Sequence, residues 1–297
     1  MRRGELIGGL GVLLPALTLA AFPAWGLAGG EEQRFSLRFR GSYSYLQAGD
    51  VNTGLGGWFE FIRLMGEDEG MTATGGYSPL HSGYEFGADL FFSLTPTVAV
   101  GLGAGYLKSV RSSDMSLTGA EVAMTVHGKG KLSAVPIRLS ALSILPIGER
   151  VNLTAGAAVA YYAAVKLDGA MRLDELVSGD WVEQSIRARM NRLSNIGFQA
   201  WLGLEYEISR RLLVFVETQG RLAKLKNFNE AVGRTAGSGV TPFEDVGKLY
   251  LRTSSLPPVT LFIVSETVPM PEPGVTYREP KIDLSGYCLQ AGLRFRL

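Results

Sequence analysis

Residues 35–45 read FSLRFRGSYSY and alternate between apolar and polar positions. Apart from Gly41, the odd-numbered positions hold phenylalanine, leucine or tyrosine, and every even-numbered position holds serine or arginine. Successive side chains of a β-strand point to opposite faces. The segment therefore predicts a strand with one apolar and one polar face.

Seven further segments share this period of two. Short turns at residues 95–97, 146–150 and 209–211 join three pairs of them, which predicts antiparallel hairpins. The eight predicted strands, including the first, cover residues 35–45, 86–94, 98–107, 137–143, 151–165, 196–208, 212–222 and 287–297.

The links between these segments alternate in length. Long links at residues 46–83, 109–133, 168–193 and 225–281 alternate with the three short turns, so the long links all lie at one end. Outer-membrane barrels combine short periplasmic turns, long outer loops and strands with outward apolar faces. The expected fold is all-β, an antiparallel eight-stranded up-and-down transmembrane β-barrel with long extracellular loops, formed by residues 29–297.

Composition excludes several other classes of protein. The 29 basic and 28 acidic residues give a net charge of +1, so the chain lacks the basic character of a nucleic-acid binder. Past residue 28 no stretch reaches the roughly 18 apolar residues that a membrane-spanning helix needs. A single cysteine, Cys288, excludes an intrachain disulfide, and its inward position on the last strand predicts a buried side chain.

Residues 1–28 resemble a secretory signal peptide. Arg2 and Arg3 form a positive start, an apolar run follows from Leu6 to Ala21, and the small residues Gly26 and Ala28 precede the expected cut. The alternative is an uncleaved N-terminal membrane anchor. The signal-peptide interpretation predicts export from the cytosol.

The last strand, GYCLQAGLRFRL at residues 286–297, resembles the end of small bacterial outer-membrane barrels of the OmpA/OmpX type. Such barrels end in a membrane-insertion signal of alternating apolar residues, usually closed by phenylalanine, whereas this chain closes with leucine. The resemblance implies location in the outer membrane, contact with its lipids including lipopolysaccharide, and insertion by the barrel-assembly machinery. The residues matching the signal are Leu289, Ala291, Leu293, Phe295 and Leu297.

The inward-facing positions of the predicted barrel carry many charges. Eight strands leave a lumen just wide enough for side chains, so these charges are expected to pair as a structural network around Gly101, Gly103 and Gly105. The alternative is a narrow pore or conduit for ions or hydrophobic solutes. The predicted network comprises Arg38, Arg40, Glu85, Asp89, Arg138, Glu205, Glu207, Glu217, Arg221 and Arg294, and parity adds Lys166, Gln219, Gln290 and Arg296.

A lipid A-modifying enzyme is a third possibility, because some eight-stranded barrels act on that lipid. The chain has two histidines, His81 beside Ser82 at the outer rim and His127 in the second long link. Adjacent residues of a strand point apart, so His81 and Ser82 are poorly placed to act together. We therefore expect no catalytic, cofactor or metal site.

Tyrosines gather toward the outer-loop ends of the predicted strands, where an interfacial girdle of aromatic residues is expected. The set comprises Tyr43, Tyr45, Tyr84, Tyr106, Tyr161 and Tyr162, and Phe295 falls near the opposite end.

Two of the long links contain patterns that predict secondary structure. Apolar residues at helical spacing predict a short helix at residues 53–66, which could cap the barrel, lie on the membrane or bury its apolar stripe against other loops. Residues 50–54 resemble the start of a calcium loop, but a turn is expected because the later ligand positions are apolar. Residues 248–255 and 259–268 could form an extracellular hairpin, or two more membrane strands giving ten.

These observations predict a non-enzymatic outer-membrane barrel with a packed, charged lumen. Its long loops would serve surface structure or binding of a partner that the sequence does not identify.

Overall fold

A closed antiparallel barrel forms one end of the molecule. The structure is a computed structural model that describes residues 34–190, 195–226 and 228–297, so the predicted signal at residues 1–28 lies outside the described residues. The barrel closes because β4 pairs with β3 on one side and with β6 on the other. Around the barrel the order is β1, β3, β4, β6, β7, β10, β11 and β18, and β18 pairs with β1. The predicted eight-stranded antiparallel barrel is confirmed.

The elements fall into two groups, barrel strands and elements beyond the barrel. The barrel strands are β1 (Phe35–Leu46), β3 (Ser82–Ser93), β4 (Val98–Thr118), β6 (Pro136–Pro146), β7 (Val151–Tyr162), β10 (Ile196–Ser209), β11 (Leu212–Leu222) and β18 (Gly286–Arg296). Beyond the barrel are α2 (Asp50–Asp68), β2 (Thr72–Gly76), β5 (Ala123–Ala134), β8 (Val165–Glu175), β9 (Trp181–Met190), β12 (Lys224–Lys226), β13 (Glu230–Gly237), β14 (Val240–Ser255), β15 (Pro258–Ser265), β16 (Val275–Arg278) and β17 (Lys281–Asp283).

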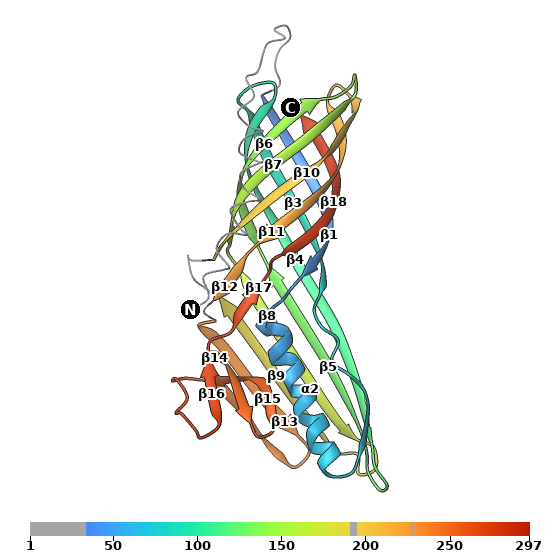
Figure 1. The fold of residues 1–297 in the computed structure, drawn as a ribbon, viewed down its shortest axis with the longest axis vertical. Coiled ribbons are helices and arrows are strands. Elements are labelled where there is room, and N and C mark those ends of the chain that lie inside the picture. Colours follow the sequence, from blue (N-terminus) through green and yellow to red (C-terminus); the bar gives the residue numbers. More distant parts are fainter. Residues whose placement is uncertain (1–33, 191–194, 227) are drawn as a thin grey trace.

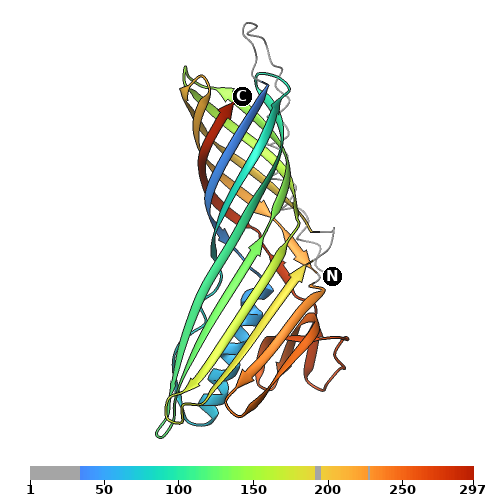
Figure 2. The same ribbon diagram turned by 180° about the vertical axis from the view of Figure 1, so that it is seen from behind.

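The sheet that forms the barrel wall continues beyond the barrel mouth. We call this part, with the helix α2 packed on it, the extension. Strand β4 has 21 residues, a length of about 70 Å at ~3.3 Å per residue, so it runs far past a membrane of ~30 Å. Its second half pairs with β2 and β5, and the sheet continues through β8, β9, β13, β14 and β15. Figure 1 shows the extension at the end opposite the C-terminus, and Figure 2 shows β4 entering it.

The long links are therefore not loops, which corrects the expectation from sequence. Residues 109–133 and 168–193 contain the second half of β4 and strands β5, β8 and β9. Strands β5 and β6 follow each other almost without a break, and so do β7 and β8, so two long hairpins run from the barrel into the extension. The sequence predicts loops where the apolar alternation ends, but the strands continue past that point without the alternation.

The alternative of ten membrane strands is wrong. The predicted hairpin exists as β14 and β15, but β14 pairs with β13 in the extension and neither strand joins the barrel. The hairpin is thus part of the extended sheet beyond the barrel.

Helix α2 lies against one face of the extension (Figure 2). It is longer at both ends than the predicted helix and starts at Asp50, so the expected turn at residues 50–54 is the first helical turn instead. Its apolar side joins a buried cluster with β4, β5, β8 and β15. Gly57 permits this approach, because a Cβ there would lie 1.7 Å from the carbonyl oxygen of Thr260 on β15. The expected burial of the apolar stripe against neighbouring segments is observed.

Large apolar side chains cover the outside of the barrel. Paired residues on neighbouring strands point to the same side of the barrel wall. Phe39 pairs with Ala88 and Leu293 on the outer side, whereas Arg40 pairs with Gly87 and Gly292 on the inner side. Exposed residues of this kind include Phe86, Leu102, Leu139, Leu202 and Leu289. Along β1 the apolar face extends about 33 Å, or about 25 Å after the usual strand tilt, which matches the apolar band of an outer-membrane barrel. Among the described helices, none has the length and apolar character to cross a membrane.

Candidate functional site

Glu85 on β3 is the centre of a charge network inside the barrel. It is fully buried, and its carboxylate accepts hydrogen bonds from Arg40 on β1 at 2.7 Å and from Arg221 on β11 at 2.8 Å. Arg138 on β6 lies 3.4 Å from the same carboxylate and donates to Asp89 at 2.8 Å. These contacts connect β1, β3, β6 and β11, so they cross the lumen.

A second group surrounds Glu217 on β11. Arg38 forms an ion pair with its carboxylate, and Gln290 and Thr154 donate hydrogen bonds to it at 2.6 and 2.9 Å. The amide oxygen of Gln290 in turn accepts a hydrogen bond from Arg40 at 3.2 Å, which joins this group to the one around Glu85. The chain of polar contacts is therefore continuous across the middle of the barrel.

Further ion pairs lie toward the end of the barrel that carries the short turns. Arg294 pairs with Glu205 at 2.9 Å, and Arg296 pairs with Glu207 at 3.0 Å. Of the ten residues predicted for the network, all except Glu207 are buried. Glu207 is 27% exposed at the rim. Lys166 does not face the lumen, because it belongs to the exposed face of β8 rather than to a barrel strand.

Little space remains between these side chains. A cavity lined by Arg38, Arg40 and Arg138 has a volume of about 10 Å³, room for about one water molecule. Gly103 is needed for this packing, since a Cβ there would lie 1.8 Å from the Asp89 carboxylate. Five arginines and four carboxylates are buried in the barrel, so their charges nearly balance and each side compensates the desolvation of the other.

The two histidines lie apart from the network. His81 stacks on Tyr45 and its Nδ1 lies 3.2 Å from the carbonyl oxygen of Leu46. Ser82 accepts a hydrogen bond from Arg111, so its hydroxyl is held by a cation rather than by a base. His127 lies on β5, not in a loop, and pairs with Asp114 at 2.6 Å on an exposed surface. No group of metal-ligating side chains occurs among the described residues.

Aromatic residues mark both ends of the barrel surface, with Phe35 beside Phe92 at the end that carries the short turns. Tyr43 contacts Tyr84, and Tyr45 stacks on Tyr287, at the end where the extension begins. Tyr162 does not belong to this girdle as expected, because it is fully buried and accepts a hydrogen bond from Gln199 inside the barrel. The residues of the predicted insertion signal alternate outward on β18, with Leu289, Leu293 and Leu297 exposed.

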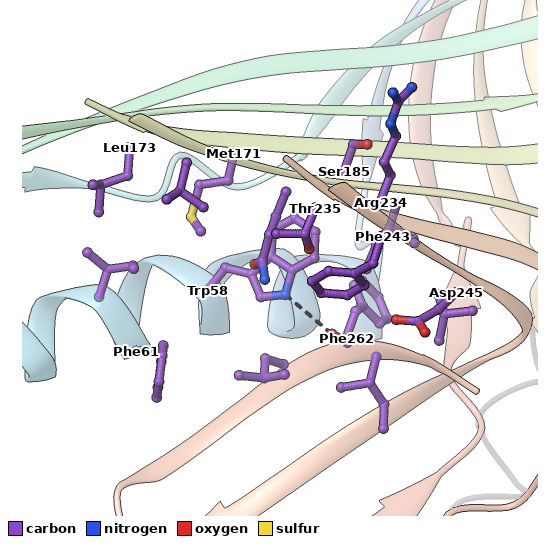
Figure 3. Close-up of a pocket in the computed structure, with 18 residues that line it drawn as sticks. Trp58, Phe61, Met171, Leu173, Ser185, Arg234, Thr235, Phe243, Asp245 and Phe262 are labelled. Atoms are coloured by element: carbon purple, nitrogen blue, oxygen red, sulfur yellow. Dashed lines mark hydrogen bonds between the residues drawn. The ribbon is translucent and has the colours of Figure 1, made fainter. Parts of the chain in front are cut away.

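The extension contains a cavity of about 440 Å³ between α2 and the curled part of the sheet (Figure 3). Trp58 of α2 forms part of its wall and donates a hydrogen bond to the carbonyl oxygen of Phe262 on β15. Met171 on β8, Ile186 on β9 and Phe243 on β14 also line it. No sequence motif marks this cavity, because it forms only where β13 to β15 curl over the helix.

Comparison with known proteins gives distant structural similarities. A crystal structure of the outer-membrane protease OmpT from Escherichia coli matches with 9% identity and a TM-score of 0.34, covering 89% of this chain and 95% of that chain. A crystal structure of a Pseudomonas aeruginosa FadL homologue matches with 6% identity and a TM-score of 0.14, covering 88% and 89%. No family model and no curated protein matches the sequence. At these scores neither structure assigns an activity.

Proposed function

We propose that this protein is a non-enzymatic outer-membrane barrel with a sealed lumen that holds the extension at the cell surface for binding. The observation that carries this proposal is the continuous network around Glu85 and Glu217, which crosses the lumen beside a cavity with room for about one water. A pathway for ions or solutes would need several of these buried ion pairs to separate at once. Function then resides in the part that projects from the membrane.

The apolar belt and its aromatic ends support the membrane location. The resemblance of the last strand to barrels of the OmpA/OmpX type, together with the predicted signal at residues 1–28, supports export and assembly in the outer membrane. Outer-membrane lipids, including lipopolysaccharide, are then the expected neighbours of the belt, and the barrel-assembly machinery is the expected partner during insertion.

The surroundings of the histidines support a non-enzymatic role. General acid–base catalysis needs a base within hydrogen-bond reach of a nucleophile. His81 and Ser82 have separate partners, and the pair formed by His127 and Asp114 lies on an open strand surface outside the cavities described above. The lipid A mass spectrum of cells expressing the protein should equal that of cells without it, and a new lipid A species would contradict this assignment.

Cysteine labelling in intact cells tests the orientation of the extension. The native Cys288 is buried in the barrel, so only the introduced cysteines should react with the labelling reagent. Ser178→Cys lies in the turn between β8 and β9, and Glu149→Cys lies in the short turn between β6 and β7; both positions are exposed. A membrane-impermeant maleimide should label S178C in intact cells and E149C only after permeabilisation. The reverse order would overturn the proposal.

A further inference from the structure

The cavity in the extension has the form of a binding site for one elongated molecule. Its walls come from β8, β9, β13 and β14 on one side and from α2 and β15 on the other. Three interstrand spacings separate β8 from β14, so the lining of the cavity extends about 14 Å across the sheet. Its volume of about 440 Å³ lies within the ~300–1,000 Å³ of small-molecule sites.

The walls of the cavity are mainly apolar. Phe61, Met171 and Leu173 lie at one end of the view in Figure 3, Trp58 lies in the middle, and Phe262 lies toward the other end. Trp58 and Phe262 are almost completely buried behind the cavity surface. An apolar chain placed here would exchange water for these side chains, which is favourable in proportion to the area covered.

The polar lining residues all lie on the sheet side of the cavity, and Asp245 on β14 is the one carboxylate among them. Gln184 and Thr235 are directly paired across β9 and β13, and Asp245 lies on β14 opposite Gly233, on the same face of the sheet. Arg234 points away from the helix to the other face of the sheet (Figure 3). Gln184 lies beside Met171 of β8 and Thr235 lies in the middle of the cavity, so the β14 end presents the carboxylate of Asp245. This end lacks a cation among its inward-facing side chains.

We propose that this cavity binds an unbranched aliphatic amphiphile whose head group donates hydrogen bonds, such as an amine or an alcohol, rather than an anionic lipid acid. The chain lies along Met171 and Trp58, and the head group lies at the β14 end beside Asp245. A carboxylate head would be repelled by Asp245, whereas an ammonium head would be attracted to it. The inference goes beyond the proposed function, because it depends on the folded extension and not on whether the lumen is sealed.

Equilibrium binding of radiolabelled dodecylamine, 1-dodecanol and dodecanoate tests this proposal. The full-length protein is placed in phospholipid nanodiscs, and uptake by empty nanodiscs is subtracted. One dodecylamine should bind per protein, dodecanol should bind several-fold more weakly, and dodecanoate about tenfold more weakly than dodecylamine. Dodecanoate binding as tightly as dodecylamine, or no uptake above that of empty discs, would overturn the proposal.

Two variants and a matched control locate the site. Thr235→Phe fills the middle of the cavity and should weaken dodecylamine binding at least tenfold, whereas Val232→Phe, on the opposite face of the same strand, should leave it unchanged. Asp245→Asn removes the charge of an exposed side chain at nearly the same size, so the cavity stays open. It should reduce dodecylamine binding several-fold and spare dodecanol. Equal binding by T235F and the wild type, or an equal effect of D245N on both probes, would contradict the site. A conducting barrel would overturn the proposed function without changing these results.

Discussion

At the scale of single residues, Glu85 has the most demanding environment in the barrel. It is fully buried and contacts three arginines that come from three different strands. Removing one partner of a buried ion pair leaves uncompensated charge in a medium that solvates it poorly. The network therefore makes the stability of the barrel depend strongly on this carboxylate.

Glu85→Gln should lower the free energy of unfolding by about 3–5 kcal/mol, because three buried arginines lose their shared counter-charge. Urea titration in lipid vesicles, followed by tryptophan fluorescence, measures this change. Glu207→Gln is the matched control: its partly exposed pair with Arg296 should cost no more than about 1 kcal/mol. Equal losses in the two variants would show that the network does not hold the barrel together.

Asp50 at the start of α2 links the helix to the segment containing β16 and β17. Burial alone would raise the pKa of this carboxyl group, but hydrogen bonds from Arg278 and from the backbone of Lys281, together with their charges, lower the pKa below its ordinary value of 3.8. The charged form is thus favoured in the folded protein. Its stabilising effect is present above pH 3.8 and is lost as the pH falls through the lowered pKa.

Asp50→Asn should therefore destabilise the extension by about 1 kcal/mol at pH 7, since one partner of a half-exposed ion pair is removed. The difference between variant and wild type should shrink toward zero as the pH falls below 3.8. Urea titrations of both proteins at a series of pH values measure it. A difference that stays constant down to the lowest pH would contradict this role.

At the scale of elements, contact between α2 and β15 depends on glycines. Gly54 and Gly57 face Phe262 and Thr260, and side chains at these positions would overlap them. On the other side of the helix, Gly128 and Gly130 of β5 leave room for Phe59 and Leu55. The helix can pack this closely between β15 and β5 because these glycines have no side chains at the points of contact.

Gly57→Ala should release α2 from β15, because the added methyl group would overlap the Thr260 carbonyl oxygen. Overpacking of this kind costs about 1–3 kcal/mol, more than the ~1 kcal/mol gained from better helix propensity. Limited proteolysis should cut the extension faster and leave the barrel intact. Gly56→Ala, which meets only the movable ring of Tyr77, is the control. Equal cleavage of both variants would refute the explanation.

The glycines also explain which elements could be predicted from the sequence. Barrel strands show a clear alternation because their outward face meets lipid and must be apolar. In β5 the inward face includes Gly128 and Gly130, so the alternation weakens and the segment has the composition of a loop. The residues that fill the space, Leu55 and Phe59, lie some 70 positions earlier in the chain. A local sequence pattern cannot show a contact between residues so far apart in the chain.

The lumen and the cavity also differ in how far the sequence predicts them. Alternation predicts which residues of a barrel strand face the lumen, since the face of each strand is a local property. It fails at Lys166, because alternation does not show that the barrel strand β7 ends at Tyr162 and that Lys166 belongs to β8. Which carboxylate meets which arginine depends on how the closed barrel staggers its strands, as in the contact of Glu85 with Arg221 across 136 positions. The cavity depends on the curl of β13 to β15 over α2, which no single segment encodes.

At the scale of the whole molecule, the two ends have different tasks. The barrel presents an apolar belt outside and paired charges inside, which suits a permanent position in a membrane. The extension continues the same strands into water and encloses its own buried cluster around α2. Sealing of the lumen is the claim on which this division rests, because a conducting barrel would itself carry a function.

Conductance across a planar lipid bilayer tests that claim most directly. The purified wild-type protein, inserted at a density verified by antibody or by labelling of S178C, should produce no steady channel openings at moderate voltage. Replacing Arg138 and Arg221 together by alanine should remove side chains from the lumen and produce small openings in the same assay. Large, steady channels from the wild-type protein would contradict the account.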